Sequence, residues 1–242
     1  MSGSDVGNRL LSALAPHERE AVLRACKLVR LCWGERLVEA GQPLQHVHFP
    51  ESGVLSVVAN DGDRDQIEIA LIGREGLCGV PIALGCLAMP FGVTVQSEGT
   101  AYAMPAQVFG DVASDVPALH RLALMYSQVL TTQIAETSRA NARHTVESRL
   151  ARRLLMAHDR LDADDLAITH EALSVSLGVR RPGVTVALHV LEGEHMIKAK
   201  RGSIRILDRA KLSAAASGSY GKAEAEYQRT FPTQAAGMLP VG

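Results

Sequence analysis

The fold of this chain is decided by residues 167–208, which read AITHEALSVSLGVRRPGVTVALHVLEGEHMIKAKRGSIRILD. A first helix is expected from about Thr169 to Leu177, because apolar residues recur at helical spacing after a threonine oxygen that can cap the helix start. Gly178 then ends this helix, since glycine adopts a positive φ at little cost. A second helix is expected from Arg181 to about Glu192, with a proline tolerated in its first turn.

The second helix and the residues after it complete a supersecondary pattern. Val184, Leu188 and Leu191 share one face and can pack on the first helix, so the opposite face stays free. Beyond Gly193 the run HMIKAKRGSIRILD alternates apolar and basic residues around a turn at 201–203, as a two-stranded hairpin does. Two helices joined by a glycine turn and followed by a basic hairpin predict a winged helix-turn-helix.

These residues resemble the DNA-binding domain of Crp/Fnr-type bacterial transcription regulators. The resemblance is carried by THEALSVSLGVRRPGVTVALHVLE followed by IKAKRGSIRILDRAKL. The glycine turn, the Leu-Glu close of the second helix, the basic hairpin and the Leu-Asp-Arg exit occur in that order. The resemblance implies a homodimer that binds a two-fold symmetric site on double-stranded DNA, and it implies RNA polymerase as a further partner.

The resemblance also assigns DNA contacts. It puts a base-reading arginine at Arg181, the first residue of the second helix. The second base-reading arginine of the family falls on Val186, which can touch a thymine methyl group but cannot hydrogen-bond guanine, so a different DNA sequence is expected. Arg180 stands where the family usually has serine. The expected DNA-binding residues are Thr169, His170, Arg180, Arg181, Thr185, Val186, His189, Lys198, Lys200 and Arg201.

Charge is distributed unevenly along the chain. Residues 1–143 hold 11 Lys and Arg against 15 Asp and Glu, a net charge of −4, whereas residues 144–212 hold 12 against 9, a net charge of +3. The basic segment is the one that contains the helix-turn-helix pattern. Its local field therefore favours a polyanion, although the whole chain carries a net charge of −1.

The sequence pattern of the N-terminal half is typical of a β-roll. Two short helices are expected at residues 8–14 and 16–26, and extended runs punctuated by turn residues follow from Leu28. The expected strands are Val47–Phe49, Val54–Ala59, Gln66–Ile72, Gly92–Gln96 and Thr100–Met104. Many short strands indicate a jelly-roll-like sandwich, and the layout is similar to the cyclic-nucleotide-binding-like domain of the same family.

The nucleotide-binding signature of that domain is degenerate here. In nucleotide-binding members a phosphate cassette offers a glycine, a glutamate for the ribose and an arginine for the cyclic phosphate. The corresponding residues 79–95 read GVPIALGCLAMPFGVTV, with Val80 in place of the glutamate and no Lys or Arg. Because a buried phosphate without a cation is costly, the effector is expected to be something other than conventional cAMP or cGMP, or absent.

A long helix is expected from Pro117 to about Arg139. Apolar residues alternate at three- and four-residue intervals along it, which is a heptad seam. A helix packed in the core of its own domain has the same pattern, but the resemblance favours the dimer axis. The expected dimerisation residues are Leu119, Leu122, Tyr126, Val129 and Gln133.

Two alternatives concern the β-roll. Gly41, His46, His48 and Glu51 approximate the metal-binding sequence of cupins, which leaves a cupin-like metal-dependent enzyme or metal sensor open. Two of its gaps are one residue short and no third histidine follows in the late strands, so paired strand histidines without a metal are favoured. The four cysteines form no Cys-x-x-Cys pair, so they are expected to pack as small hydrophobic residues, with redox gating as the alternative.

The sequence thus predicts an α+β protein that is not an enzyme and binds no cofactor. Its expected parts are an antiparallel β-roll effector domain at residues 1–110, a dimerisation helix and hinge at 111–143, the winged helix-turn-helix at 144–212 and a disordered tail at 213–242. No membrane span or signal peptide is recognisable, so the cytoplasm is the expected location.

Overall fold

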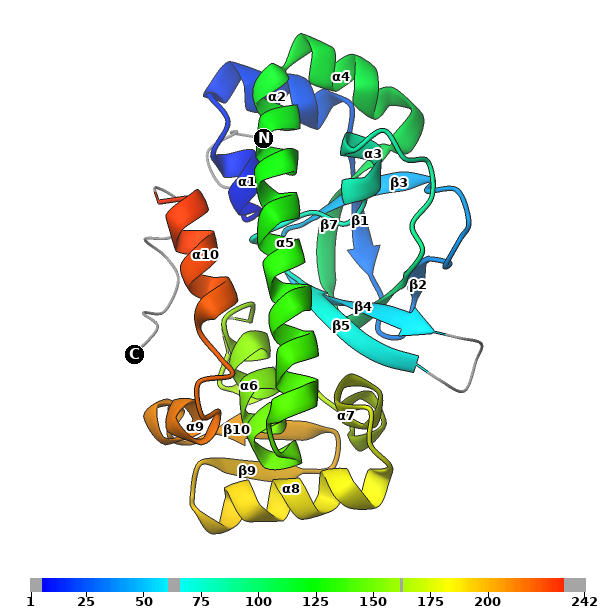
Figure 1. Ribbon diagram of the computed structural model, residues 1–242. Coiled ribbons are helices and arrows are strands. Elements are labelled where there is room, and N and C mark those ends of the chain that lie inside the picture. Colours follow the sequence, from blue (N-terminus) through cyan, green and yellow to red (C-terminus); the bar gives the residue numbers. More distant parts are fainter. Residues whose placement is uncertain (1–5, 61–65, 162, 233–242) are drawn as a thin grey trace.

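The structure is a computed structural model that describes residues 6–60, 66–161 and 163–232. A β-roll occupies the upper part, one long helix runs along its side, and a smaller helix-rich domain with a β-ribbon lies below (Figure 1). This arrangement confirms the predicted α+β fold class.

Two antiparallel sheets form the β-roll. Their strand orders are β1-β7-β3 and β2-β6-β4-β5. Side chains such as Phe49, Leu55 and Val93 point between the sheets and are fully buried. The five predicted strands are present, and the structure adds two more. The strands are β1 (Lys27–Leu31), β2 (Arg36–Val38), β3 (His46–Pro50), β4 (Val54–Asn60), β5 (Gln66–Ile72), β6 (Gly92–Ser97) and β7 (Gly99–Pro105).

Short helices close the upper end of the β-roll. Asn8 ties the first of them to the sheet, because its side-chain amide donates to the carbonyls of Pro50 and Gly76 while its oxygen accepts from the first turn of the helix. Among the described helices, none has the length and hydrophobicity of a membrane span. The elements are α1 (Arg9–Ser12), α2 (Pro16–Arg24), α3 (Val80–Ala83), η1 (Ala106–Val108) and α4 (Phe109–Asp115).

The long helix α5 (Pro117–Arg143) packs its most apolar face on the β-roll of its own chain. The five residues predicted to form the dimer seam are all buried in that contact, so the prediction that they meet a partner is wrong. Gln133 shows why: its side-chain oxygen accepts from the backbone N–H of Leu71 at 2.7 Å and its amide donates to the Leu71 carbonyl at 3.1 Å. The corrected positions are Leu119, Leu122, Tyr126, Val129 and Gln133.

The C-terminal domain has its own core. Leu150, Leu173, Val184 and Leu188 are among the buried residues that join its helices, as the predicted apolar faces require. Gly178 ends α7 with φ +58°, and Thr169 caps its start by accepting from the Ala172 N–H. The elements are α6 (Val146–His158), β8 (Asp165–Leu166), α7 (His170–Leu177), α8 (Arg181–Gly193), β9 (Ile197–Lys200), β10 (Ser203–Ile206) and α9 (Arg209–Ala215).

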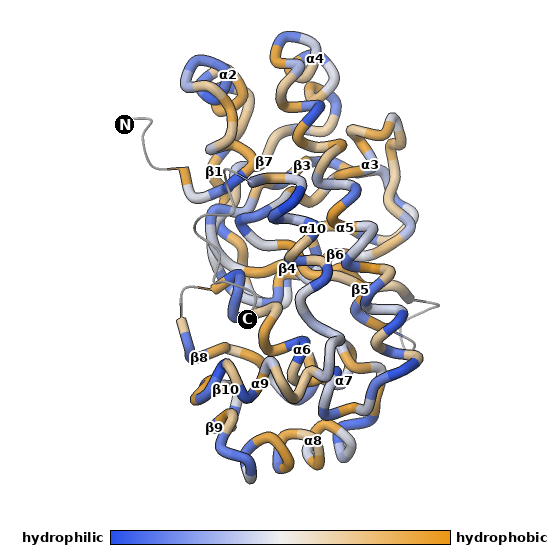
Figure 2. Tube along the Cα trace, turned by 60° about the vertical axis from the view of Figure 1, so that its left-hand side comes forward, coloured by the Kyte–Doolittle hydropathy of each residue, from blue (hydrophilic) through white to orange (hydrophobic). Residues whose placement is uncertain are grey.

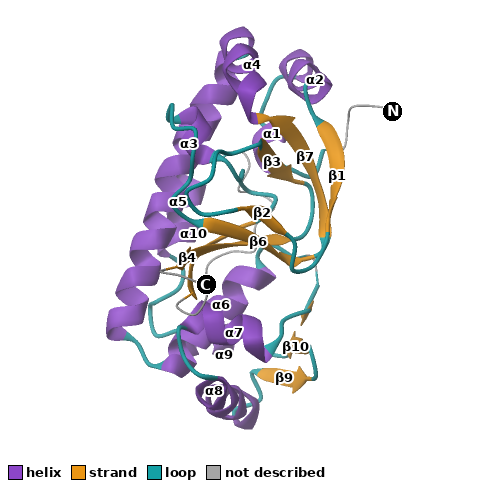
Figure 3. Ribbon diagram, turned by 90° about the vertical axis from the view of Figure 1, so that its right-hand side faces the viewer, coloured by secondary structure: helices purple, strands orange, loops and turns teal. Residues whose placement is uncertain are grey.

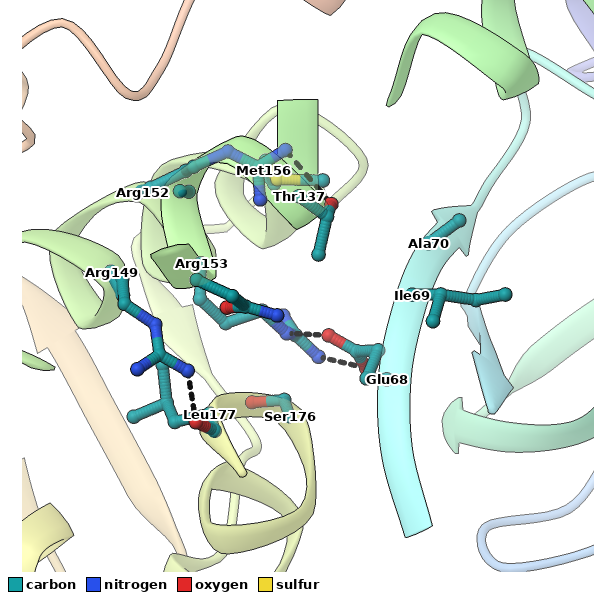
Figure 4. Close-up of a pocket in the computed structure, with 12 residues that line it drawn as sticks. Glu68, Ile69, Ala70, Thr137, Arg149, Arg152, Arg153, Met156, Ser176 and Leu177 are labelled. Atoms are coloured by element: carbon teal, nitrogen blue, oxygen red, sulfur yellow. Dashed lines mark hydrogen bonds and ion pairs between the residues drawn. The ribbon is translucent and has the colours of Figure 1, made fainter. Parts of the chain in front are cut away.

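Two buried ion pairs connect the domains, and Figure 4 shows the one between Arg153 and Glu68. Arg153 of α6 pairs with Glu68 of β5, with Nη2 donating to Oε2 at 3.1 Å, and the Ser56 hydroxyl donates to the same oxygen at 2.6 Å. Arg160 pairs with Glu75, with Nε and Oε1 2.9 Å apart. All four charged side chains are at most 7% exposed. The domains are therefore joined by charges that are removed from water.

The segment after the winged domain is ordered as far as residue 232, so the prediction of a disordered tail is wrong there; residues 233–242 lie outside the described part of the chain. Helix α10 (Lys222–Thr230) folds back and packs along α5 (Figure 1). Its Tyr227 ring lies 5.0 Å from that of Phe231, between ring centroids, and both side chains are at most 2% exposed. Tyr227 on α10 and Phe231, directly after its last residue, bury enough apolar surface to order the segment.

The domain interface predicts an asymmetry between single and double substitutions. Arg153→Met leaves the Glu68 carboxylate buried without its cation, which should lower the free energy of unfolding by about 3–5 kcal/mol. Replacing both residues, in Arg153→Met/Glu68→Leu, should cost clearly less because no charge stays buried. Urea denaturation of the two variants and the wild type measures both values. Equal losses in the two variants would contradict the assignment.

Candidate nucleic-acid interface

A groove of about 650 Å³ runs between α8 and the β9–β10 ribbon. The N-terminus of α7 closes one end, and the turn at Arg201 and Gly202 forms part of the opposite wall. Along α8, hydrophobic and hydrophilic residues alternate, since one face packs inward and the other faces solvent (Figure 2). Seven of the ten predicted DNA-binding residues line this groove: Thr169, His170, Arg181, Thr185, His189, Lys200 and Arg201.

Arg181 stands at the first residue of α8 and is exposed. Its guanidinium pairs with the carboxylate of Glu171, which lies in the first turn of α7. Both side chains are more than half exposed, so water screens the pair and it holds the arginine only loosely. The Thr185 hydroxyl, one turn later, donates to the Arg181 carbonyl at 3.1 Å. The arginine side chain thus stays available to a ligand in the groove.

The ribbon is held against α8 by Glu192. Its Oε1 accepts from the backbone N–H of Ala199 at 2.8 Å, which fixes the position of β9 beside the helix. Lys200 and Arg201 are exposed at the end of this strand. The ribbon therefore presents two cations at a set distance from the helix.

Three predicted residues lie outside the groove lining. Arg180, Val186 and Lys198 are exposed, with Val186 59% exposed on the outer side of α8. Val190, which is 46% exposed and one turn beyond Val186, was not among the predicted residues. The available signal was the four-residue spacing of two valines on the face of α8 opposite the buried Val184, Leu188 and Leu191.

Two models of known domain families match this chain. The model of the cyclic nucleotide-binding domain matches residues 28–115, and the model of the Crp-like helix-turn-helix domain matches residues 148–215. The chain belongs to the Crp/Fnr family. It is a Crp/Fnr-type transcription regulator with a helix-turn-helix DNA-binding domain. Among curated proteins, no sequence matches this chain.

Solved structures of Crp/Fnr proteins share this fold. A transcriptional regulator of the family from Eubacterium rectale is 16% identical, with a TM-score of 0.67 over 86% of this chain and 98% of that chain. A CRP-family regulator from Thermus thermophilus is 20% identical, with a TM-score of 0.67 over 80% and 98%. The c-di-GMP responsive regulator CLP from Xanthomonas campestris is 15% identical, with a TM-score of 0.65 over 79% and 99%.

The residues at the nucleotide position do not fit a cyclic nucleotide. Val80 begins the short helix α3 and is 6% exposed, so no carboxylate is available for a ribose there. The space between this segment, the sheet and α5 is lined by apolar residues without a charged or hydrogen-bonding side chain. A cyclic phosphate placed there would lose its hydration without gaining a cation.

The cupin-like set does not assemble into a metal site. His46 and His48 share a face of β3, as predicted, with ring centroids 5.8 Å apart. Glu51, however, accepts from the backbone N–H groups of Gly7 and Asn8 at 2.8 and 2.9 Å, where it holds the start of α1. Within the described residues, no group of three His, Cys, Asp or Glu side chains is arranged to hold a metal ion.

The cysteines divide into two classes. Cys78 is buried and Cys26 is partly buried, and burial raises the pKa of each thiol to about 12. A thiol with such a pKa is a poor nucleophile at neutral pH. Cys32 and Cys86 are exposed, which corrects the expectation that the cysteines pack as buried hydrophobic residues.

His48 gives the β-roll a predictable acid response. Burial, with a smaller effect from the charge of His46, lowers the pKa of His48 to about 4, whereas an unfolded histidine titrates near 6.5. The unfolded chain therefore binds the proton first, so stability is complete above about pH 6.5 and falls as the pH drops towards 4.

Between pH 7 and pH 5 this group should cost about 2 kcal/mol of unfolding free energy. His48→Gln should remove that part of the loss, as urea denaturation at the two pH values measures. His17→Gln, at a position outside the buried core, is the matched control. The same pH dependence in His48→Gln and wild type would refute the assignment.

Proposed function

We propose that this regulator binds a two-fold symmetric DNA site as a homodimer, with one α8 helix in the major groove of each half-site. The observation that carries the proposal is the groove between α8 and the ribbon, which gathers Arg181, His189, Lys200 and Arg201 on one exposed surface. A helix flanked by a basic ribbon suits a duplex, because the helix reads base edges while the ribbon holds phosphates.

We assign a distinct role to each residue that lines the groove or lies beside it. Arg181 exchanges its loose pair with Glu171 for guanine O6 and N7, which accept two hydrogen bonds from one guanidinium. Val186, with Val190 behind it, presents methyl groups to thymine. Thr169 and His170 contact phosphates at the start of α7, and Arg180, Thr185, Lys198, Lys200 and Arg201 add backbone contacts.

The face of α5 opposite the β-roll is the proposed dimer contact. Leu124, Thr131, Ala135, Ser138 and Ala142 lie on it at intervals of three, four or seven residues, which is heptad spacing, and none of them is buried. In Figure 3, α5 runs along one edge of the molecule with no other described element outside it. Four of these five side chains are small, so a partner helix can approach closely.

Domain roles follow from this arrangement. Residues 1–110 form the effector domain, 111–143 the dimerisation helix and hinge, and 144–212 the DNA-binding domain. The lining around Val80 supports an effector other than cAMP or cGMP. We expect RNA polymerase as a partner and the cytoplasm as the location, as in the family that the chain belongs to.

Arg181→Ala tests the groove assignment. Loss of the guanidinium should weaken binding to the selected site by about 1–3 kcal/mol, roughly 5- to 150-fold, and relax the preference at that base pair. The site is obtained by selection from a random duplex library, and affinity is measured by fluorescence anisotropy. Arg24→Ala is the matched control, because Arg24 is an exposed arginine paired with Glu20 on α2 of the β-roll. An unchanged affinity and footprint for Arg181→Ala would exclude the assignment.

The same assay distinguishes the contribution of the ribbon to DNA binding from that of the helix. Lys200→Ala should weaken binding to selected and scrambled duplexes alike, and lower the slope of log affinity against log salt by about 1. A loss confined to the selected sequence would mean that Lys200 reads a base and not a phosphate.

Ala135→Arg tests the dimer. A long charged side chain at a contact between two small faces should shift the protein towards monomer, since each copy meets its symmetric counterpart. Sedimentation at micromolar concentration measures the mass. Ser114→Arg, on the outer face of α4, is the control and should stay dimeric. A monomeric wild type, or a fully dimeric Ala135→Arg, would refute this interface.

A further inference from the structure

An apolar chamber of about 110 Å³, partly open to solvent, lies beside the β-roll at the segment that corresponds to the family's phosphate cassette. Three parts of the chain surround it: the sheet, the segment from Gly79 to Phe91, and α5. The residues that define its walls include Val57, Ile72, Val80, Phe91, Leu130 and Ile134. We call this space the β-roll chamber.

The chemistry of the walls selects the occupant. Every side chain that lines the β-roll chamber is apolar, so the chamber offers neither a counter-ion nor a side-chain hydrogen bond. Water entering it would lose hydrogen bonds. An enclosed engineered apolar cavity of about 150 Å³ binds benzene or xenon, and the β-roll chamber is of the same order of size but opens to solvent, so a ligand can enter it. An uncharged apolar molecule is therefore the class of ligand that these walls accept.

We propose that the β-roll chamber binds a small uncharged apolar molecule, about the size of benzene or smaller, and that its occupancy changes the position of α5. The loss of the nucleotide signature is then a change of ligand class, from a charged nucleotide to a hydrocarbon-like molecule. The binding step needs no DNA. Only its regulatory consequence rests on the proposed function.

The contacts of α5 provide the route of transmission. Leu130 and Ile134 form a wall of the β-roll chamber, and Gln133 between them holds the backbone of Leu71 through two hydrogen bonds. One turn further, the Thr137 hydroxyl accepts from Nη2 of Arg152 at 3.1 Å, and Arg152 belongs to α6 of the DNA-binding domain. A shift of this wall therefore reaches the domain that carries α8.

Benzene and toluene are the probes, with cAMP as the charged comparison. The full chain should take up benzene saturably, with a rise in its unfolding temperature, and should show no saturable response to cAMP. Leu130→Phe and Ile134→Phe fill the space and should weaken benzene binding at least tenfold. Leu28→Phe adds the same volume at an exposed strand position and should bind benzene as the wild type does. Saturable cAMP binding, or benzene binding that the filled variants retain, would overturn the proposal.

A wild-type measurement keeps the test valid if the filled variants do not fold. A crystal pressurised with xenon should show the gas beside Leu130 and Ile134, and its absence there would overturn the β-roll chamber as a site. DNA affinity is then measured with and without benzene. Benzene binding that leaves the affinity unchanged would overturn the transmission through α5. Benzene uptake by a protein that binds no selected DNA in either condition would count against the proposed function and leave the β-roll chamber assignment in place.

Discussion

Burial of one face of α5 against the β-roll determines where the other parts of the molecule lie. Tyr126 and Gln133 on that face are almost completely buried, and Gln133 is bonded to the backbone of a sheet strand. The helix therefore has one orientation about its axis, and its opposite face must point outward. Helix α10 packs against one side of α5, and α6 begins shortly after α5 ends. Because α8 packs on α6, the orientation of α5 also determines where α8 lies.

The contact between the domains combines an apolar cluster that includes Val54, Leu71 and Met156 with two buried ion pairs. A buried carboxylate is costly unless a cation lies at hydrogen-bonding distance, so Glu68 accepts little displacement of Arg153. Apolar surfaces slide past one another at small cost, whereas a desolvated ion pair has a narrow range of favourable geometry. The pairs at Glu68 and Glu75 thus give the domain arrangement directional precision more than stability.

Local signals in the sequence were enough for the winged domain and most of the β-roll. Gly178, with its positive φ, and the alternation on both sides of Gly202 depend on neighbouring residues alone, and the structure confirms both. The groove that gathers Arg181 and Lys200 follows from that same local pattern. The features that were missed depend on contacts between distant residues. Both faces of α5 repeat at three- and four-residue intervals, so periodicity could not show which one meets the sheet. Glu68 and Arg153 are 85 positions apart and carry no local sign of pairing.

The packing of α10 on α5 also has a consequence for biosynthesis. Helix α10 follows both domains in the chain. A ribosome therefore completes α5 and the DNA-binding domain before it synthesises the helix that packs on α5. At about 5–20 residues per second, the interval from the end of α5 to the end of α10 lasts on the order of several seconds. During that time the DNA-binding domain contacts the β-roll without the packing of α10 on α5. A fragment that ends before α10 would lack this packing permanently.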